Sequence, residues 1–153
     1  MYDGYKVLDV HSHVSHPMGG MGQVFMFMNA MNGTIPSPID TPAAAQFGLD
    51  DEAFARSVGA HIAYIDERQI DVQVLGPRPF LMQGFMADHL LPTWTRIVND
   101  TIHKQCLMHP NRFVGAAMLP QDVNAPDASH LLGELNRCVD DYGFVGAYVS
   151  PDP

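Results

Sequence analysis

Two histidines near the N-terminus have the spacing of a metal-ligand pair. His11 and His13 follow the apolar run 5–10, which is typical of a strand. Side chains two positions apart on a strand point to the same face, so we expect both imidazoles to project together from the strand end. Imidazole nitrogens suit a divalent transition metal, with zinc as the first choice and manganese as the second. The alternative is a pair of strand-end histidines that face water.

Three other residues could act on a substrate. Arg78 lies in the turn after the second expected strand, and its planar guanidinium could hold a substrate carboxylate through two hydrogen bonds. His89 begins the second expected helix and could donate or accept a proton near neutral pH. His16 lies three residues past the histidine pair and is expected to line the substrate pocket. The alternatives are a surface arginine in a proline-rich turn and histidines without a catalytic role.

Other polar residues are expected to support the site or the fold. If the first strand is regular, Asp9 shares the face of His11, where it could orient a ligand histidine or form a polar layer of the core. Asn99 and Asp100 are expected to have a structural role through side-chain hydrogen bonds. The histidines within the expected helices are interpreted as ordinary surface or interface residues: His61, His103 and His130.

Composition narrows the class of protein. The chain has 153 residues, of which 46% are apolar, as in one ordinary globular domain. A formal net charge of −9 argues against binding to nucleic acid or to an anionic membrane surface. Cys106 and Cys138 lack metal-like spacing and are expected to be free thiols. The sequence shows no signal-peptide pattern and no apolar run near ~20 residues, so a cytoplasmic location is expected.

Strand and helix patterns alternate along the chain. Strands are expected at 5–13, 70–75, 113–119 and 144–149, and helices at 51–68, 88–108 and 127–141. In the last helix, Val139 is expected on the apolar side, and Gly143 is expected to follow the helix end. The segment 14–49, rich in Gly, Pro and Met, is interpreted as a long insert, packed as a lid or a subunit contact.

This alternation predicts an α/β fold with parallel strands and right-handed crossovers. Four strands make the N-terminal half of a TIM (β/α)₈ barrel, since the complete barrel needs about 200 residues or more. An open flavodoxin-like sheet is the alternative. It accommodates the chain length, but it does not explain why paired histidines end the first strand.

An ordered series of short segments also resembles a known family. The segments are Asp9-Val10-His11-Ser12-His13, Val98-Asn99-Asp100, His109-Pro110-Asn111-Arg112-Phe113-Val114-Gly115, Met118-Leu119-Pro120, Glu134-Leu135-Asn136-Arg137-Cys138 and Tyr142-Gly143-Phe144-Val145-Gly146. Together they resemble amidohydrolase family 2, the group of 2-amino-3-carboxymuconate semialdehyde decarboxylase and related carboxy-lyases and hydratases. Leu119-Pro120-Gln121 and the turn at Gly76-Pro77-Arg78 are most similar to the 4-oxalomesaconate hydratase subfamily.

The resemblance implies a metal bound by His11 and His13. It also implies a third histidine after a fifth strand and an acidic ligand after an eighth, which lie beyond the four strands of this chain. The chain is therefore expected to be one partial domain, 1–153, truncated after its fourth strand, from a protein about twice as long.

The implied activity is that of a metal-dependent lyase, a decarboxylase or a hydratase. Its substrate would be a small carboxylate from aromatic-compound catabolism, and the protein is expected to form homo-oligomers. One alternative is a metal-dependent hydrolase of an ester, lactone or amide. Another is a non-catalytic half-barrel whose open edge strands associate with another copy.

Overall fold

The computed structural model describes residues 2–15, 51–81, 88–122 and 124–150. Nearly all of the expected insert at 14–49, and with it His16, lies outside these residues. The described chain alternates strands and helices as expected. The strands are β1 (Leu8–His13), β2 (Val72–Gly76), β3 (Phe113–Met118) and β4 (Gly146–Tyr148). The helices are α3 (Asp51–Glu67), α4 (Leu91–Met108) and α5 (Ser129–Asp140), with short 3₁₀ turns η1 (Pro79–Leu81) and η2 (Asp88–Leu90).

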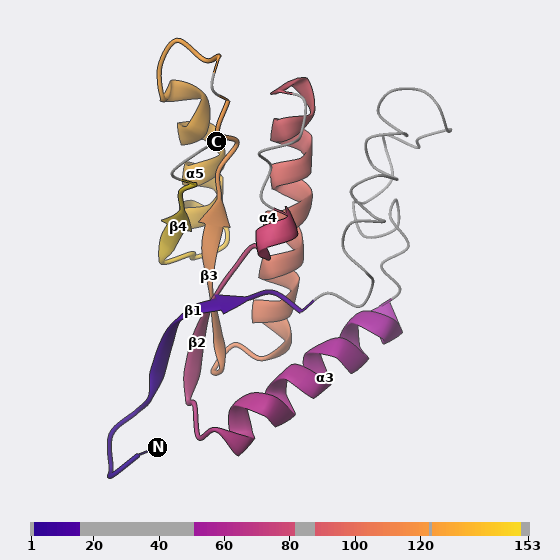
Figure 1. Cartoon of the computed structure of the whole chain (residues 1–153), viewed down its shortest axis with the longest axis vertical. Helices are drawn as coiled ribbons and strands as arrows, with labels where there is room; N and C mark the ends of the chain where they lie inside the picture. Colours follow the sequence, from indigo (N-terminus) through magenta and orange to yellow (C-terminus); the bar gives the residue numbers. More distant parts are fainter. Residues whose placement is uncertain (1, 16–50, 82–87, 123, 151–153) are drawn as a thin grey trace.

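The strand order separates the two architectures that the sequence allowed. All neighbouring strands are parallel, and their order is β1-β2-β3-β4, the same as in the sequence. In a flavodoxin-like sheet the first strand lies between the second and the third, so the strand order is not sequential. A sequential order is that of a TIM barrel, and the four strands form a curled half-barrel (Figure 1). The half-barrel prediction is confirmed.

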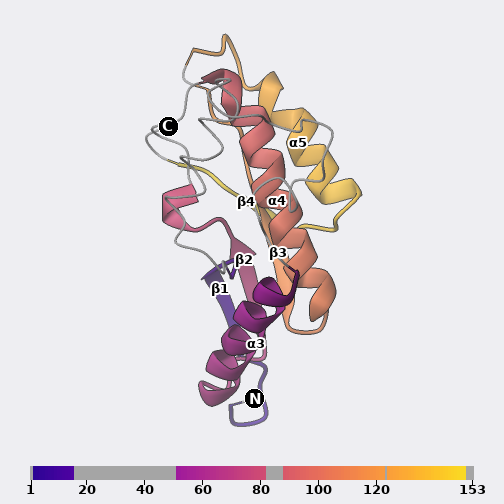
Figure 2. The same cartoon turned by 90° about the vertical axis from the view of Figure 1, so that its right-hand side faces the viewer.

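The apolar core lies between the sheet and the helices, which Figure 2 shows against one face of the strands. The helices contribute residues at helical spacing, as expected for a helix layer packed on a sheet. Large members that are 2% exposed or less include Phe54, Val58, Ile65, Leu75, Ile102 and Phe113. Cys106 and Cys138 lie beside this core as free thiols, and burial raises the pKa of each to about 12.

The last helix departs from the expected apolar face. Val139 is 46% exposed, whereas Glu134 and Cys138 are buried. Glu134 and Cys138 are four positions apart and share a face, while Val139 is rotated away by one residue. The glycine after the helix fits its predicted role, since Gly143 has a φ of +67° and its N–H donates to the carbonyl of Val139.

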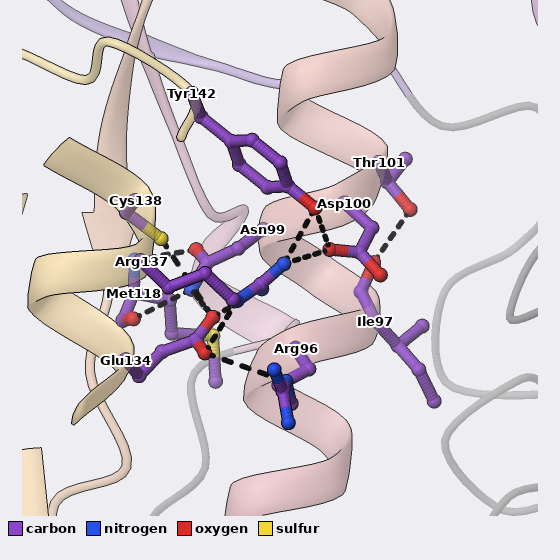
Figure 3. Close-up of polar contacts among 10 residues, drawn as sticks. All are labelled: Arg96, Ile97, Asn99, Asp100, Thr101, Met118, Glu134, Arg137, Cys138 and Tyr142. Atoms are coloured by element: carbon purple, nitrogen blue, oxygen red, sulfur yellow. Dashed lines mark hydrogen bonds and ion pairs between the residues drawn. The ribbon is translucent and has the colours of Figure 1, made fainter. Parts of the chain in front are cut away.

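A polar cluster joins α4 and α5 to the end of β3 (Figure 3). The Asn99 amide exchanges two hydrogen bonds with the Met118 backbone, at 2.8 and 2.9 Å, and donates a third to Glu134. Arg137 donates to Glu134 and to Asp100, each at 2.8 Å. These contacts confirm the structural role expected of Asn99 and Asp100.

No helix within the described part of the chain is both long and apolar enough to cross a membrane.

Candidate active site

A cavity of about 570 Å³ opens where β1 and β2 end. The carboxyl ends of the strands are where TIM-barrel enzymes carry their active sites. Its lining includes the charged, amide and imidazole side chains of Asp9, His11, His13, His61, Gln73 and Arg78. The structure thus brings the predicted metal pair and the predicted carboxylate anchor to one pocket.

The two histidines of β1 lie on the same side of the strand. Their ring centroids are 5.2 Å apart and the rings are nearly perpendicular, at 84°. Nδ1 of His13 donates to the carbonyl of Pro77 at 2.8 Å, which leaves Nε2 as the lone-pair nitrogen. Burial, the largest influence, lowers the pKa of His13 and favours the neutral ring that a metal requires.

The first strand is irregular at the histidines, so the regular alternation on which the expected face of Asp9 depended is not present. Asp9 pairs with Gln73 and Ser12 pairs with Leu75, so β1 has one extra residue in this interval. The bulge breaks the alternation on which the expectation depended. Asp9 accepts a hydrogen bond from Gln73, which in turn contacts His61 of α3, so its carboxylate lies on the helix side of the sheet.

Arg78 lies two residues after the end of β2, and one edge of its guanidinium is hydrogen bonded to the backbone. Its Nε donates to the carbonyl of Val14 at 2.9 Å, and Val14 is fully buried. Within the described residues, no carboxylate forms an ion pair with this guanidinium. The Nη atoms can therefore meet a carboxylate in the pocket.

His61 was misjudged from sequence. It was expected to be an ordinary helix-surface residue, but it is partly buried and lines the pocket. Its ring nitrogens contact Gln73 at 2.7 Å and Ser15 at 2.9 Å. Burial, its largest influence, lowers the pKa of His61. Ser57, a small residue, lies four positions before His61 and therefore on the same face of α3. A small residue at that spacing is the signal in the sequence that this helix face borders a cavity.

Tyr148 of β4 reaches the same end of the sheet and was not singled out from sequence. Its ring is 5.6 Å from the His11 ring, and its hydroxyl donates to the Ser12 carbonyl at 3.3 Å. The ring lies over Gly76, where an added Cβ would be 2.2 Å from it. A glycine that ends a strand is a sequence signal for such a close approach.

A second cavity, of about 530 Å³, lies at the opposite ends of the strands. Three of its charged groups already bind one another or the backbone. Arg112 pairs with Asp66 at 2.7 Å, and Asp71 accepts the N–H of Val7 at 2.8 Å. At this end of a barrel such contacts stabilise the fold rather than bind substrate.

Comparison with known proteins places the chain. No family model matches it. The 2-keto-4-carboxy-3-hexenedioate hydratase of Sphingobium sp. (strain NBRC 103272 / SYK-6) is 31% identical over 114 residues, which is 73% of this chain and 33% of the hydratase. The crystal structure of 4-oxalomesaconate hydratase from Rhodopseudomonas palustris is 27% identical with a TM-score of 0.73, and the match covers 96% of this chain and 42% of that one. This chain is homologous to the amidohydrolase-family lyases.

A further solved structure with a similar fold contains a metal. A dihydroxybenzoic acid decarboxylase from Polaromonas sp. JS666, solved with bound manganese and the inhibitor 2-nitroresorcinol, is 21% identical with a TM-score of 0.59. The match covers 95% of this chain and 38% of the decarboxylase, and at this identity it shows the fold alone. The chain thus spans about a third of the curated hydratase and under half of each solved structure.

This chain has two candidate metal ligands, His11 and His13, in the part that the structure describes. No group of three His, Cys, Asp or Glu side chains within that part could hold a metal ion. His11 and His13 suit a divalent metal in ring type and spacing, so they fit as part of a ligand set. His89 is exposed in η2 and does not line the pocket, while His16 lies outside the described residues.

Proposed function

We propose that this chain is the metal-binding part of a lyase, a decarboxylase or hydratase, that acts on a small carboxylate from aromatic-compound catabolism. One observation carries the proposal. His11 and His13 share one side of a strand end, and the Nδ1 of His13 is already engaged by Pro77. The names of the similar hydratases and decarboxylase, all of which describe enzymes of carboxylates, support the reaction class.

His11 and His13 would hold the metal, and a divalent ion bound there would act as a Lewis acid toward an oxygen of the substrate or of water. Arg78 would hold a substrate carboxylate through its Nη atoms, because its Nε is already bonded to Val14. His89 is proposed as a proton donor or acceptor that would reach the substrate from η2, outside the lining of the pocket. Zinc and manganese are both candidates, and the manganese in the Polaromonas decarboxylase supports manganese.

The remaining ligands would come from outside the described residues. We propose that 1–153 is a partial domain, and that the missing half of the barrel supplies them. The coverage of the similar proteins supports this, since the chain matches 33% of the hydratase from Sphingobium and 42% of the one from Rhodopseudomonas.

A second candidate function, an association module without catalysis, has one observation in its favour. β1 and β4 are both edge strands, and Val10 on β1 is 67% exposed. Metal binding separates the two functions, because an association module has no need of a metal.

The test is calorimetric titration of the purified chain with Zn²⁺ and with Mn²⁺. We expect one site per chain in the unaltered protein and a loss of affinity of about tenfold or more in His11→Ala and in His13→Ala, since each removes one of the two ligands. His130→Ala is the matched control, because His130 is an exposed histidine on α5. Equal affinity in the unaltered chain and in the double His11→Ala, His13→Ala variant would overturn the proposal.

A further inference from the structure

We propose that His61, with Gln73 and Gln105, is a positioning residue that sets the separation of the two metal-binding imidazoles. These three residues are called the relay below. This inference rests on the proposed metal site. It adds the side chains that hold the strand of the two ligands in place. None of the three is expected to touch the metal.

The ligand strand needs support from outside the sheet. β1 is an edge strand, so β2 is its one neighbour within the described sheet. Their pairing is irregular between Asp9 and Ser12, the interval that contains His11. An edge strand with a bulge has little backbone pairing to fix the direction of its side chains. Side-chain hydrogen bonds must therefore fix this segment.

One arm of the relay holds the chain just before the histidine pair. The Asp9 carboxylate accepts the backbone N–H of His11 at 3.1 Å and the side-chain amide of Gln73 at 2.7 Å. Gln73 is 3% exposed, so its side chain is held almost entirely within the protein. Through Asp9, the backbone of the first ligand is tied to β2.

The other arm holds the chain just after the pair. The Oε1 of Gln105 accepts the backbone N–H of Ser15 at 2.7 Å. Both residues are buried, and Gln105 comes from α4, the central helix of the layer. Through Ser15, the segment that follows the second ligand is tied to the helices.

His61 connects the two arms, and the hydrogen bonds determine its tautomer. Since the Gln73 amide nitrogen donates to Asp9, the Gln73 oxygen must accept the proton of His61 Nε2 at 2.7 Å. Nδ1 is then an acceptor, and it faces the Ser15 hydroxyl at 2.9 Å and the Gln105 amide at 3.1 Å. The lowered pKa of the ring, caused mainly by burial, agrees with this neutral form.

The relay thus fixes positions 9 and 15, and both ligands lie between them. Groups that hold metal ligands in place typically change metal affinity 10- to 100-fold when they are removed. The relay would do so through the backbone on either side of the two ligands. A purely structural role would lower stability and leave the affinity of the remaining ligands unchanged. The two roles can therefore be separated by measurement.

The test compares Gln73→Leu and Gln105→Leu with Asn99→Leu. All three remove a buried amide of similar size, but Asn99 bonds to Met118 and Glu134 and has no contact with β1 among the described residues. Zn²⁺ affinity is measured by calorimetry, backbone amide exchange at His11 and Ser15 by NMR, and Tm by calorimetric scanning. His61→Gln, which keeps a donor toward Gln73, serves if the leucine variants fail to fold.

We expect the two relay variants to bind Zn²⁺ at least tenfold more weakly and to exchange the amides of His11 and Ser15 faster. Asn99→Leu should lower Tm and keep its Zn²⁺ affinity within about twofold, because its contacts lie in a separate cluster. Unchanged affinity in both relay variants, or an equal loss in Asn99→Leu, overturns the inference. If the unaltered chain binds no Zn²⁺, the proposed function fails. The relay is then tested by amide exchange alone, and unchanged exchange rates at His11 and Ser15 in the relay variants overturn it.

Discussion

At the scale of single residues, the site depends on which atoms are already engaged. Nδ1 of His13 is bonded to Pro77, and Nε of Arg78 is bonded to Val14. Each side chain is thereby held by one edge and presents its other nitrogens to the pocket. A metal on the histidines and a carboxylate on the arginine would share this cavity of about 570 Å³.

Arg78 permits a test of carboxylate binding that does not require turnover. We predict that Arg78→Lys weakens binding of a simple carboxylate probe, benzoate, to the metal-loaded chain by about tenfold, because an ammonium keeps the charge and loses the two-pronged geometry. Binding is measured by ligand-observed NMR titration. Arg96→Lys is the control, since the Arg96 side chain is 61% exposed and lies outside the pocket. Equal affinities for Arg78→Lys and the unaltered chain would show that the guanidinium does not hold the ligand.

At the scale of elements, the sequence predicted which segments form strands and helices better than it predicted how they meet. The expected helix 51–68 and the observed α3 differ by one residue, and the expected strand 113–119 differs equally little from β3. These boundaries follow from local patterns of apolar residues, glycine and proline. The bulge in β1 depends on pairing with β2, more than sixty positions away, and no local pattern encodes it.

The same limit explains the site residues that were misjudged. Asp9 was placed by assuming regular alternation, and His61 was judged by its helix alone. Both side chains are oriented by Gln73, which comes from another element. By contrast, the shared side of His11 and His13 was predicted from their two-residue spacing, and their rings do lie together although the irregular interval of β1 includes His11.

The Tyr148 ring of β4 packs closely against Gly76 of β2, and this contact leads to a prediction about the free energy of unfolding. Gly76→Ala places a Cβ 2.2 Å from the Tyr148 ring, so the ring must move. We expect a loss of about 1–3 kcal/mol in the free energy of unfolding, measured by urea titration, as is usual for overpacked sites. Gly133→Ala on α5, where an added Cβ meets nothing within 4 Å, should not destabilise the protein.

A double variant isolates the cause. In a Tyr148→Ser background, Gly76→Ala should lose most of its cost, because the clashing ring is absent. An undiminished cost there would show that the backbone at Gly76, and not the ring of Tyr148, requires glycine.

At the scale of the whole molecule, the half-barrel has two edge strands, β1 and β4, among the described residues. Leu8 is 57% exposed and Val149 is 67% exposed, which is unusual for apolar residues at strand ends. The sequential strand order, which the sequence could not reveal, is what assigns the chain to a barrel. Alternating strand and helix patterns occur equally in barrels and in open sheets, so the order is decided by packing.

The free energy of unfolding should depend on pH through two partly buried histidines. Burial, the largest influence on each, lowers the pKa of both His61 and His103 from 6.5. The unfolded chain then binds more protons than the folded chain just below pH 6.5, so the free energy of unfolding falls as the pH drops through that value. We predict a lower Tm at pH 5.5 than at pH 7.5.

His103 provides the control for this prediction. Its ring stacks on Tyr142 at a centroid distance of 3.9 Å, and His103→Phe keeps an aromatic ring that does not titrate. The fall in Tm between the two pH values should be smaller in this variant. A Tm that is constant or that rises on acidification would contradict the assignment of neutral histidines to the folded state.

The central claim is that His11 and His13 converge on one metal ion. X-ray absorption spectroscopy of the Zn²⁺-loaded chain measures this directly, because imidazole ligands produce a characteristic outer-shell scattering pattern. We expect two imidazole nitrogens at ~2.0–2.1 Å from the metal, with oxygen ligands completing the shell. A spectrum with oxygen ligands alone, or one unchanged in the double His11→Ala, His13→Ala variant, would contradict it.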